Sequence, residues 1–313
     1  HCKNLKDCKD GRKTLFIASY PKSGTTWLQA IIYNLLSDGN QNFSHISEFS
    51  PFFEITNTWD LENSQIEGKI KEKYEINHQN LGWRVFNTHL RWEMMPKEDN
   101  MKYIYIVRNG KDVVLSFFQH LSNQDDADCF QGNLLDFIKE WSNGKIPFGS
   151  WLHHLQSWIQ AYLHQEDIIS STTTGTTSTS DYNNNNNTGN NTGSSDNSNN
   201  KPILLLSYED LIHNPHNCIL KIISQLNLSV TSQRAEELLQ YISFNYMKEH
   251  QHQYMPISVP WKDGYSFLRK GKVGDSGNHF MSEHEAVYTA MIESGFPSEQ
   301  GGLPQWLLDL DIL

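Results

Sequence analysis

Residues 14–27, TLFIASYPKSGTTW, decide the fold of this chain. The first six form a short apolar run with β-branched members, and apolar residues recur at helical spacing over residues 25–36. A glycine-containing turn joins the two patterns. We therefore predict a buried strand, a tight turn and a helix whose first backbone amides and dipole suit an anion.

The same alternation continues along the chain. Further apolar runs typical of buried strands occupy residues 83–90 (WRVFNTHL), 102–107 (KYIYIV) and 203–208 (ILLLSY). Helical periodicity is found at residues 110–121, 134–164, 210–226, 232–249 and 282–294. Strands that alternate with helices predict an α/β fold, with a central parallel sheet and helices on both faces. We expect a single domain over residues 1–313.

One tract interrupts this domain. Residues 170–200 consist almost entirely of Ser, Thr, Asn and Gly, and Tyr182 is their only bulky side chain. Such a composition has no apolar surface to offset the entropy of ordering, so we predict a disordered, low-complexity insertion. The tract contains N-x-S/T sequons at Asn186 and Asn190, which an Asn/Thr-rich composition also generates by chance.

Charge and cysteine content limit the binding partners and the cellular location that the sequence suggests. Lys and Arg number 25 against 36 Asp and Glu, a formal charge of -11, which argues against broad binding of nucleic acid or an anionic membrane surface. No apolar run approaches the roughly 18 residues of a membrane helix. Four scattered cysteines, without C-x-x-C spacing, suit a reducing, cytoplasmic location. Because the chain opens at His1, a preceding targeting segment stays an alternative.

Several basic residues stand where an anion could bind. Lys22 lies in the first turn, but it precedes the single glycine, so the turn is not a Walker A loop. Arg108 follows the strand at 102–107, and Ser116 lies two turns into the next helix. A basic loop with glycine occupies residues 269–272, and His89 lies near the end of the run at 83–90. Ligands of open α/β sheets bind at the carboxyl ends of strands. Taken singly, Arg108 and residues 269–272 are more simply interpreted as surface charges and His89 as a structural histidine.

Four segments in this order resemble the cytosolic sulfotransferases: YPKSGTTW (20–27), RVFNTHL (84–90), VRNGKDVVLSFF (107–118) and RKGKVGD (269–275). The resemblance runs over about residues 14–297 and includes SPFFEI, FGSWLHHLQSW and YEDL. It implies a P-loop-kinase-like sulfotransferase fold. It also implies an enzyme that moves a sulfuryl group from 3′-phosphoadenosine 5′-phosphosulfate (PAPS) to a hydroxyl of a small molecule such as a phenol or sterol. The product is 3′-phosphoadenosine 5′-phosphate (PAP), and no metal is implied.

The resemblance also implies roles for individual residues. The donor would be held by Lys22, Ser23, Gly24, Thr25 and Thr26 at the 5′-phosphosulfate, Trp27 and Phe244 at the adenine, and Arg108, Ser116, Arg269, Lys270 and Gly271 at the 3′-phosphate, with Tyr208 as a further donor contact. His89 would be the general base and Lys22 would stabilise the leaving phosphate, roles that suit an imidazole and an ammonium group. Ser116 would keep Lys22 away from the donor until the acceptor arrives. Phe52, His89 and His154 would line the acceptor pocket.

Departures from the family pattern leave alternatives open. Asn87 stands where the family usually has a Lys that is thought to touch the transferring group, and Ser276 and Gly277 replace a Trp-Lys pair. The segment after them differs at Met281, Ser282 and Ala286 from the family's dimerisation motif, so we expect a monomer or a weak homodimer. Besides a transferase, the sequence fits a nucleotide-binding homologue with weakened catalysis, or a secretory-pathway enzyme that sulfates glycans.

Overall fold

Parallel strands form the centre of the structure, a computed structural model that describes residues 12–54, 67–165, 201–297, 305 and 312. The strands are β1 (Lys13–Ser19), β2 (Trp83–Thr88), β3 (Met101–Val107) and β4 (Ile203–Ser207), in the order β2-β1-β3-β4. Every pairing is parallel, with Ala18 opposite Thr88 on one side and Ser19 opposite Ile106 on the other. The α/β fold with a parallel sheet is thus confirmed, and each apolar run predicted as a strand is one.

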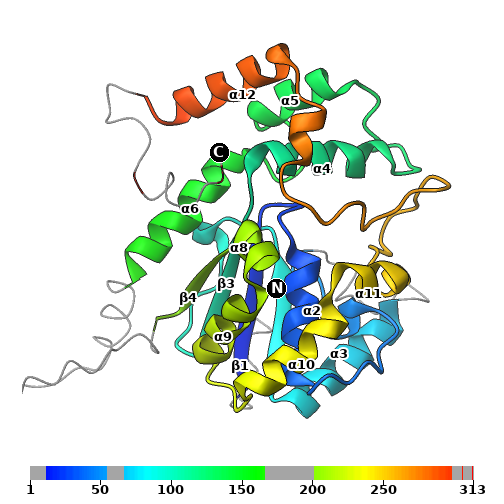
Figure 1. Cartoon of the computed structure of the whole chain (residues 1–313), viewed down its shortest axis with the longest axis vertical. Helices are drawn as coiled ribbons and strands as arrows, with labels where there is room; N and C mark the ends of the chain where they lie inside the picture. Colours follow the sequence, from blue (N-terminus) through cyan, green and yellow to red (C-terminus); the bar gives the residue numbers. More distant parts are fainter. Residues whose placement is uncertain (1–11, 55–66, 166–200, 298–304, 306–311, 313) are drawn as a thin grey trace, which may run out of the picture.

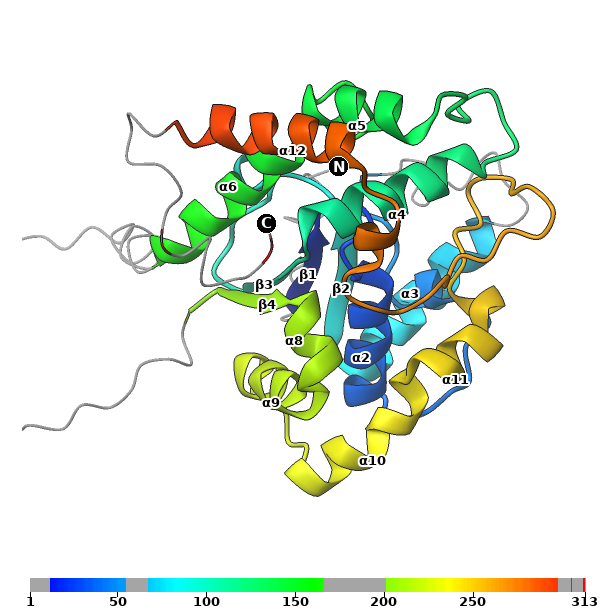
Figure 2. The same ribbon diagram turned by 45° about the horizontal axis from the view of Figure 1, so that its top comes forward.

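Helices cover both faces of this sheet (Figure 1 and Figure 2). They are α2 (Thr25–Leu36), α3 (Glu67–Leu81), α4 (Gly110–Ser122), α5 (Leu134–Ser142), α6 (Trp151–Leu163), α8 (Tyr208–His213), α9 (Pro215–Leu226), α10 (Ser232–Ile242), α11 (Phe244–Glu249) and α12 (Ser282–Gly295). Short 3₁₀ turns occupy Ile46–Glu48, Trp92–Met94, Gln251–Gln253 and Asp275–Asn278.

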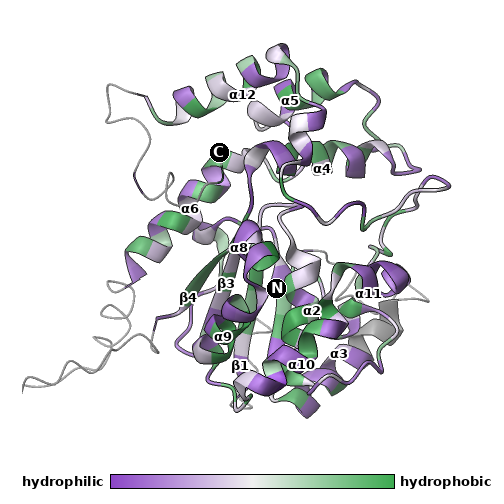
Figure 3. Ribbon diagram, in the orientation of Figure 1, coloured by the Kyte–Doolittle hydropathy of each residue, from purple (hydrophilic) through white to green (hydrophobic). Residues whose placement is uncertain are grey.

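Alternate side chains of each strand pack into two different hydrophobic layers. Phe16 and Ala18 of β1 join residues of α4, α5, α6 and α12, whereas Leu15 and Ile17 join residues of α2, α8, α9 and α10. Because both faces are covered, β1 is buried from its second residue onward. Figure 3 accordingly shows hydrophobic residues on β4 and α2, and a mixture of hydrophobic and hydrophilic residues on the peripheral helices.

Three stretches of helical periodicity are each split into two helices. The stretch at 210–226 breaks before Pro215, which occupies the first turn of α9, where its missing N–H costs no hydrogen bond. The stretch at 232–249 breaks at Ser243, whose hydroxyl accepts the Tyr246 amide and caps α11. The stretch at 134–164 breaks in the loop where Phe148 has a φ of 70°. Helix α3 was not predicted, and the predicted insertion at 170–200 lies outside the described residues.

The sequence also raised the questions of a membrane helix, a disulfide and a metal site. None of the helices in the described ranges combines the length and apolar character needed to cross a bilayer. Cys129 and Cys218 are buried and unbridged. In the same ranges, no group of three His, Cys, Asp or Glu side chains is arranged to hold a metal ion.

Candidate active site

The carboxyl ends of the parallel strands meet at one cavity of about 760 Å³. Each strand is followed by a residue that lines it: Lys22 after β1, His89 after β2, Arg108 after β3 and Tyr208 after β4. The cavity therefore lies where the strands of an open α/β sheet direct their C-terminal loops. Its size falls within the usual range of small-molecule sites.

The turn between β1 and α2 forms a cradle of backbone amides. Gly24, with a φ of 106°, is the N-cap of α2, and the first helical hydrogen bond runs from the Leu28 amide to the Gly24 carbonyl. The amides of Thr25, Thr26 and Trp27 precede that bond and are left for another acceptor. A Cβ at Gly24 would lie 2.7 Å from the Tyr208 ring, so the close approach requires glycine. The structure therefore brings together the residues expected at the 5′-phosphosulfate.

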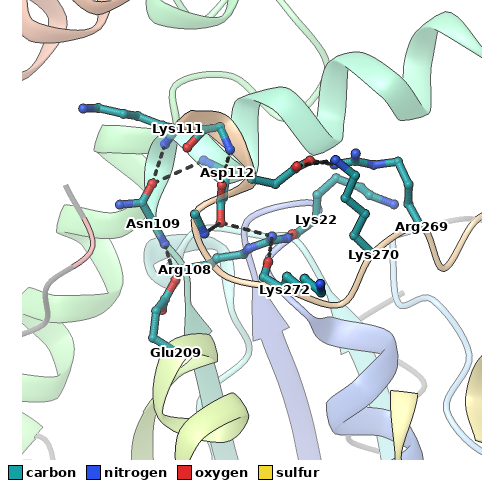
Figure 4. A network of polar contacts seen from close by, with 12 residues as sticks. Lys22, Arg108, Asn109, Lys111, Asp112, Glu209, Arg269, Lys270 and Lys272 are labelled. Atoms are coloured by element: carbon teal, nitrogen blue, oxygen red, sulfur yellow. Dashed lines mark hydrogen bonds and ion pairs between the residues drawn. The ribbon is translucent and has the colours of Figure 1, made fainter. Parts of the chain in front are cut away.

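Arg108 connects this cradle to the rest of the cavity (Figure 4). Its Nη1 donates to the Lys22 carbonyl at 3.1 Å, its Nη2 lies 3.5 Å from an Asp112 carboxylate oxygen, and its guanidinium lies 4.4 Å from the Tyr208 ring centre. Ser116, farther along α4, also lines the cavity, and its hydroxyl makes no hydrogen bond within the described ranges. The Arg108 guanidinium and the Ser116 hydroxyl therefore line the same cavity.

The loop after residue 268 brings two further cations to the cavity. Arg269 Nη2 lies 2.6 Å from Asp275 Oδ2, and the Lys270 ammonium pairs with the other oxygen of the same carboxylate. These ion pairs lower the pKa of Asp275 to about 2. The loop is also tied to α4, because Asp112 accepts the backbone amides of Gly274 and Ser276 at 2.8 Å and 2.9 Å. The basic loop expected to cover a ligand is therefore held next to Arg108.

Two aromatic rings line the far end of the cradle. Trp27 donates from Nε1 to the Ile242 carbonyl at 2.8 Å, and both Trp27 and Phe244 line the cavity. Phe244 packs so closely on Gly271 that a Cβ there would lie 2.2 Å from its ring. A flat, apolar-sided group such as a purine is the natural ligand for this part of the cavity.

His89 is held in one defined tautomer. Its Nδ1 lies 2.7 Å from the Ser19 carbonyl oxygen, an acceptor only, so Nδ1 carries the proton and Nε2 has a free lone pair. Glu54 accepts the His89 backbone amide. Burial, with a smaller contribution from the charge of Lys22, lowers the pKa of the imidazole to about 4. Phe52 and Phe148 pack against its ring at centroid distances of 5.2 Å each. The imidazole is therefore a neutral acceptor beside an aromatic wall.

The Lys22 ammonium contacts His120 rather than Ser116, the partner that the resemblance implied. Its Nζ is 3.4 Å from Nδ1 of His120 and 4.2 Å from the centre of the Phe267 ring, and it makes no hydrogen bond to Ser116. Burial, aided by the charges of Arg108 and Arg269, lowers the pKa of Lys22 to about 7. The contact that the sequence suggested for Ser116 is made in this structure by His120, one helical turn later.

Two other residues singled out in the sequence take different positions. His154 does not line the cavity: it is fully buried, accepts the Tyr105 hydroxyl at 3.0 Å and donates from Nε2 to the His89 carbonyl at 3.1 Å. It therefore supports the strand end that carries His89. Asn87 lines the cavity, but its amide nitrogen donates to the Ser50 carbonyl at 2.8 Å. The second N–H and the amide oxygen make no hydrogen bond within the described ranges.

Sequence reasoning missed His120, Phe148 and Phe267 as cavity residues. Phe148 could have been found, because it begins the FGSW segment that carries part of the resemblance. His120 and Phe267 have no such signal, since each acquires its place only when α4 and the loop 254–268 meet across the cavity.

Comparisons with known proteins agree with this geometry. The sulfotransferase domain model matches residues 12–172 and 190–301. Mouse sulfotransferase 1B1 is 28% identical over 287 residues, covering 88% of this chain and 81% of its own. Guinea pig 3-alpha-hydroxysteroid sulfotransferase is 27% identical over 290 residues, covering 89% and 83%. The crystal structure of mouse sulfotransferase SULT7A1 complexed with PAP superposes with a TM-score of 0.61 at 22% identity, over 95% of this chain and 87% of that one.

Proposed function

The chain belongs to the sulfotransferase domain family, and from that premise we propose that it transfers a sulfuryl group from PAPS to the hydroxyl of a small-molecule acceptor. The observation that carries the proposal is the meeting of Lys22, His89 and Arg108 at the carboxyl ends of three neighbouring strands, around one cavity. When bound, PAPS supplies a sulfur that leaves a phosphate oxygen as it bonds to the acceptor oxygen.

The residues present fit this donor. The free amides of Thr25 and Thr26, at the N-terminus of a helix, suit a doubly substituted phosphate. Arg108 and the unpaired hydroxyl of Ser116 suit a second phosphate, with Arg269 and Lys270 beside them. Trp27 and Phe244 suit the adenine. The donor is thus held by placed groups rather than by a general positive potential, which a chain of formal charge -11 does not offer.

His89 acts as the general base at Nε2. The Ser19 carbonyl fixes the proton on Nδ1, so the lone pair of Nε2 is available to receive the proton of the acceptor hydroxyl as the new bond forms. An anionic donor beside the ring raises the pKa of His89 above the about 4 of the ligand-free protein, since the imidazolium is then paired with a negative charge. Lys22 turns to the leaving phosphate oxygen and stabilises its charge.

The acceptor meets an aromatic surface at Phe52 and Phe148. Flat phenols and hydroxysteroids match such a wall, and relatives of this chain include hydroxysteroid sulfotransferases. We also propose a cytoplasmic location, which the scattered cysteines suit. We treat residues 1–313 as one domain, which the family match over most of the chain supports.

Asn87 favours one second function. Its side chain is an uncharged amide, so it brings no cation to the cavity, and one of its N–H groups is bound to the Ser50 carbonyl. A protein that binds the nucleotide but transfers the sulfuryl group weakly would have such a residue here.

The proposal is tested by calorimetric titration with PAP and by turnover of PAPS with a panel of phenols and hydroxysteroids. We expect tight PAP binding that Arg108→Ala weakens by about 10- to 100-fold, because a hydrogen bond to a charged group contributes about 1.5–3 kcal/mol. Arg234→Ala is the matched control, since Arg234 lies on α10 and pairs with Asp38 at the surface.

The outcomes separate the functions. PAP binding with turnover supports the transferase, and PAP binding without turnover of any acceptor supports the second function. A folded protein that does not bind PAP, or that loses affinity equally in both arginine variants, contradicts both.

A further inference from the structure

We propose that His120 is a positioning residue that holds the Lys22 side chain in the resting enzyme, on the acceptor side of the cavity and away from the donor. The inference rests on the proposed function, because it gives Lys22 a second position from which it must move to stabilise the leaving phosphate. Nothing in the sequence resemblance assigns this role to His120.

The contact is built from three separate parts of the chain. Lys22 comes from the turn after β1, His120 from α4, and Phe267 from the loop before the basic segment. The Lys22 ammonium lies 3.4 Å from His120 Nδ1 and 4.2 Å from the Phe267 ring centre, so it has one hydrogen-bond acceptor and one ring face. A cation near an aromatic face is stabilised by the quadrupole of the ring. The resting position of Lys22 is therefore a defined site.

The backbone of Lys22 is fixed while its side chain is free to change partners. Its φ of 69° is unusual for a residue other than glycine, and its carbonyl accepts from Arg108 at 3.1 Å. A movement between His120 and the donor therefore involves side-chain torsions only.

His120 is suited to release Lys22 at little cost. A neutral Nδ1 has one lone pair, and two donors compete for it, because the Tyr265 hydroxyl also lies 3.4 Å away. When Lys22 leaves, the Tyr265 hydroxyl takes the lone pair and no buried acceptor is left unpaired. The imidazole stays neutral, since burial and the charge of Lys22 lower the pKa of His120 to about 2.

Binding of the sulfuryl acceptor would displace Lys22 from His120. Phe267 and His120 line the cavity together with Phe117 and Phe52, so an aromatic acceptor that packs on these rings competes with Lys22 for them. Lys22 would then be released toward the donor only when an acceptor is present, which would limit hydrolysis of PAPS by water.

The test measures the reactivity of Lys22 itself in the ligand-free protein. Acetylation by acetic anhydride is followed by mass spectrometry across pH, and the midpoint for Lys22 is compared between variants. The charged and titratable groups around this ammonium are Arg108, Arg269, His89 and His120, with Tyr265 bound to the last. A hydrogen-bond acceptor such as His120 Nδ1 stabilises the protonated amine of Lys22. His120→Phe removes it and should therefore lower the midpoint of Lys22 acetylation by about one pH unit.

Three variants serve as controls. His120→Gln retains an oxygen acceptor and should restore the wild-type midpoint, which also guards against a His120→Phe protein that fails to fold. Ser116→Ala should leave the midpoint unchanged, because Ser116 does not contact Lys22 in this structure. Tyr265→Phe should leave it unchanged or raise it, because Lys22 then has no competitor for the lone pair.

A second readout follows sulfate release from PAPS without any acceptor. His120→Phe should raise this release severalfold, whereas His153→Gln, at an exposed position of α6 outside the cavity, should not. An unchanged midpoint in His120→Phe, or a shift of equal size in Ser116→Ala, overturns the inference. These results are independent of the PAP titration: failure of that titration overturns the proposed function, whereas the labelling reports on the contact in the ligand-free protein.

Discussion

The two halves of the cavity are built by different means. The donor half, residues 20–27 with Arg108, Ser116 and residues 269–275, depends on backbone amides, a positive φ at Gly24 and charges at strand ends. The acceptor half, formed by Phe52, Asn87, His89, His120, Phe148 and Phe267, depends on side chains from distant segments. The donor half is therefore built from three short motifs that can each be recognised in the sequence, whereas the acceptor half depends on single side chains.

The largest expected effect lies in the acceptor half, at His89. His89→Gln removes the lone pair that receives the acceptor proton, so we expect kcat to fall by about 10²- to 10⁴-fold while PAP affinity stays within about twofold. His153→Gln, at an exposed position of α6, is the control. A parallel loss of PAP affinity in His89→Gln would break the division of the cavity into two halves.

The next effect lies in the donor half, at Gly24. Gly24→Ala places a Cβ 2.7 Å from the Tyr208 ring at a φ of 106°, and the turn relieves the contact by moving its amides. We expect PAP affinity to fall by about tenfold, equivalent to ~1.4 kcal/mol. Gly82→Ala is the matched control, because Gly82 also has a positive φ but has no atoms near the position of a Cβ. If calorimetry finds equal PAP affinities in the two variants, the amides of this turn do not bind the nucleotide.

The pH dependence of kcat/KM reports on one residue from each half of the cavity, His89 and Lys22. In the free enzyme His89 must be neutral, which holds above its pKa of about 4, and Lys22 must be protonated, which holds below its pKa of about 7. We expect kcat/KM to be level between these values and to fall about tenfold for each pH unit above the upper one. Lys22→Met should lower the rate and abolish the alkaline decline. An alkaline decline that persists in Lys22→Met would assign it to another group.

The smallest effect concerns Asn87. Asn87→Lys adds a cation but removes the hydrogen bond to the Ser50 carbonyl, so the new charge is not held in place. We expect only a severalfold rise in kcat, well below the ~10²–10³ of a preorganised donor. Asn87→Met, similar in length but uncharged, separates charge from shape. An equal change in both variants would show that the added charge has no effect at this position.

The sheet and the turn that follows β1 could be predicted from the sequence, for physical reasons. A strand buried on both faces is a continuous apolar run, and the turn after it carries its own signal in Gly24 and Lys22. Helix α3 (Glu67–Leu81) escaped prediction because its charged and polar residues outnumber the apolar ones and weaken the helical period.

The acceptor half was harder to predict. His154 matched a pocket position by resemblance, yet its two nitrogens are occupied by Tyr105 and the His89 carbonyl in the core. His120 acquires its contacts from Lys22 and Tyr265, which are 98 and 145 residues away. Contacts of this kind follow from the assembled fold and leave no periodicity or motif in the chain.

The attachment of Asp112 to the amides of Gly274 and Ser276 has a kinetic meaning. It anchors the C-terminal end of the basic loop to α4, and the ion pairs of Arg269 and Lys270 with Asp275 tie the rest of the loop to the same anchor. If the two cations bind the nucleotide as proposed, release of the product has to break those contacts. We then expect product exit to be the slow step of the cycle, visible as a rapid first turnover followed by a slower steady rate.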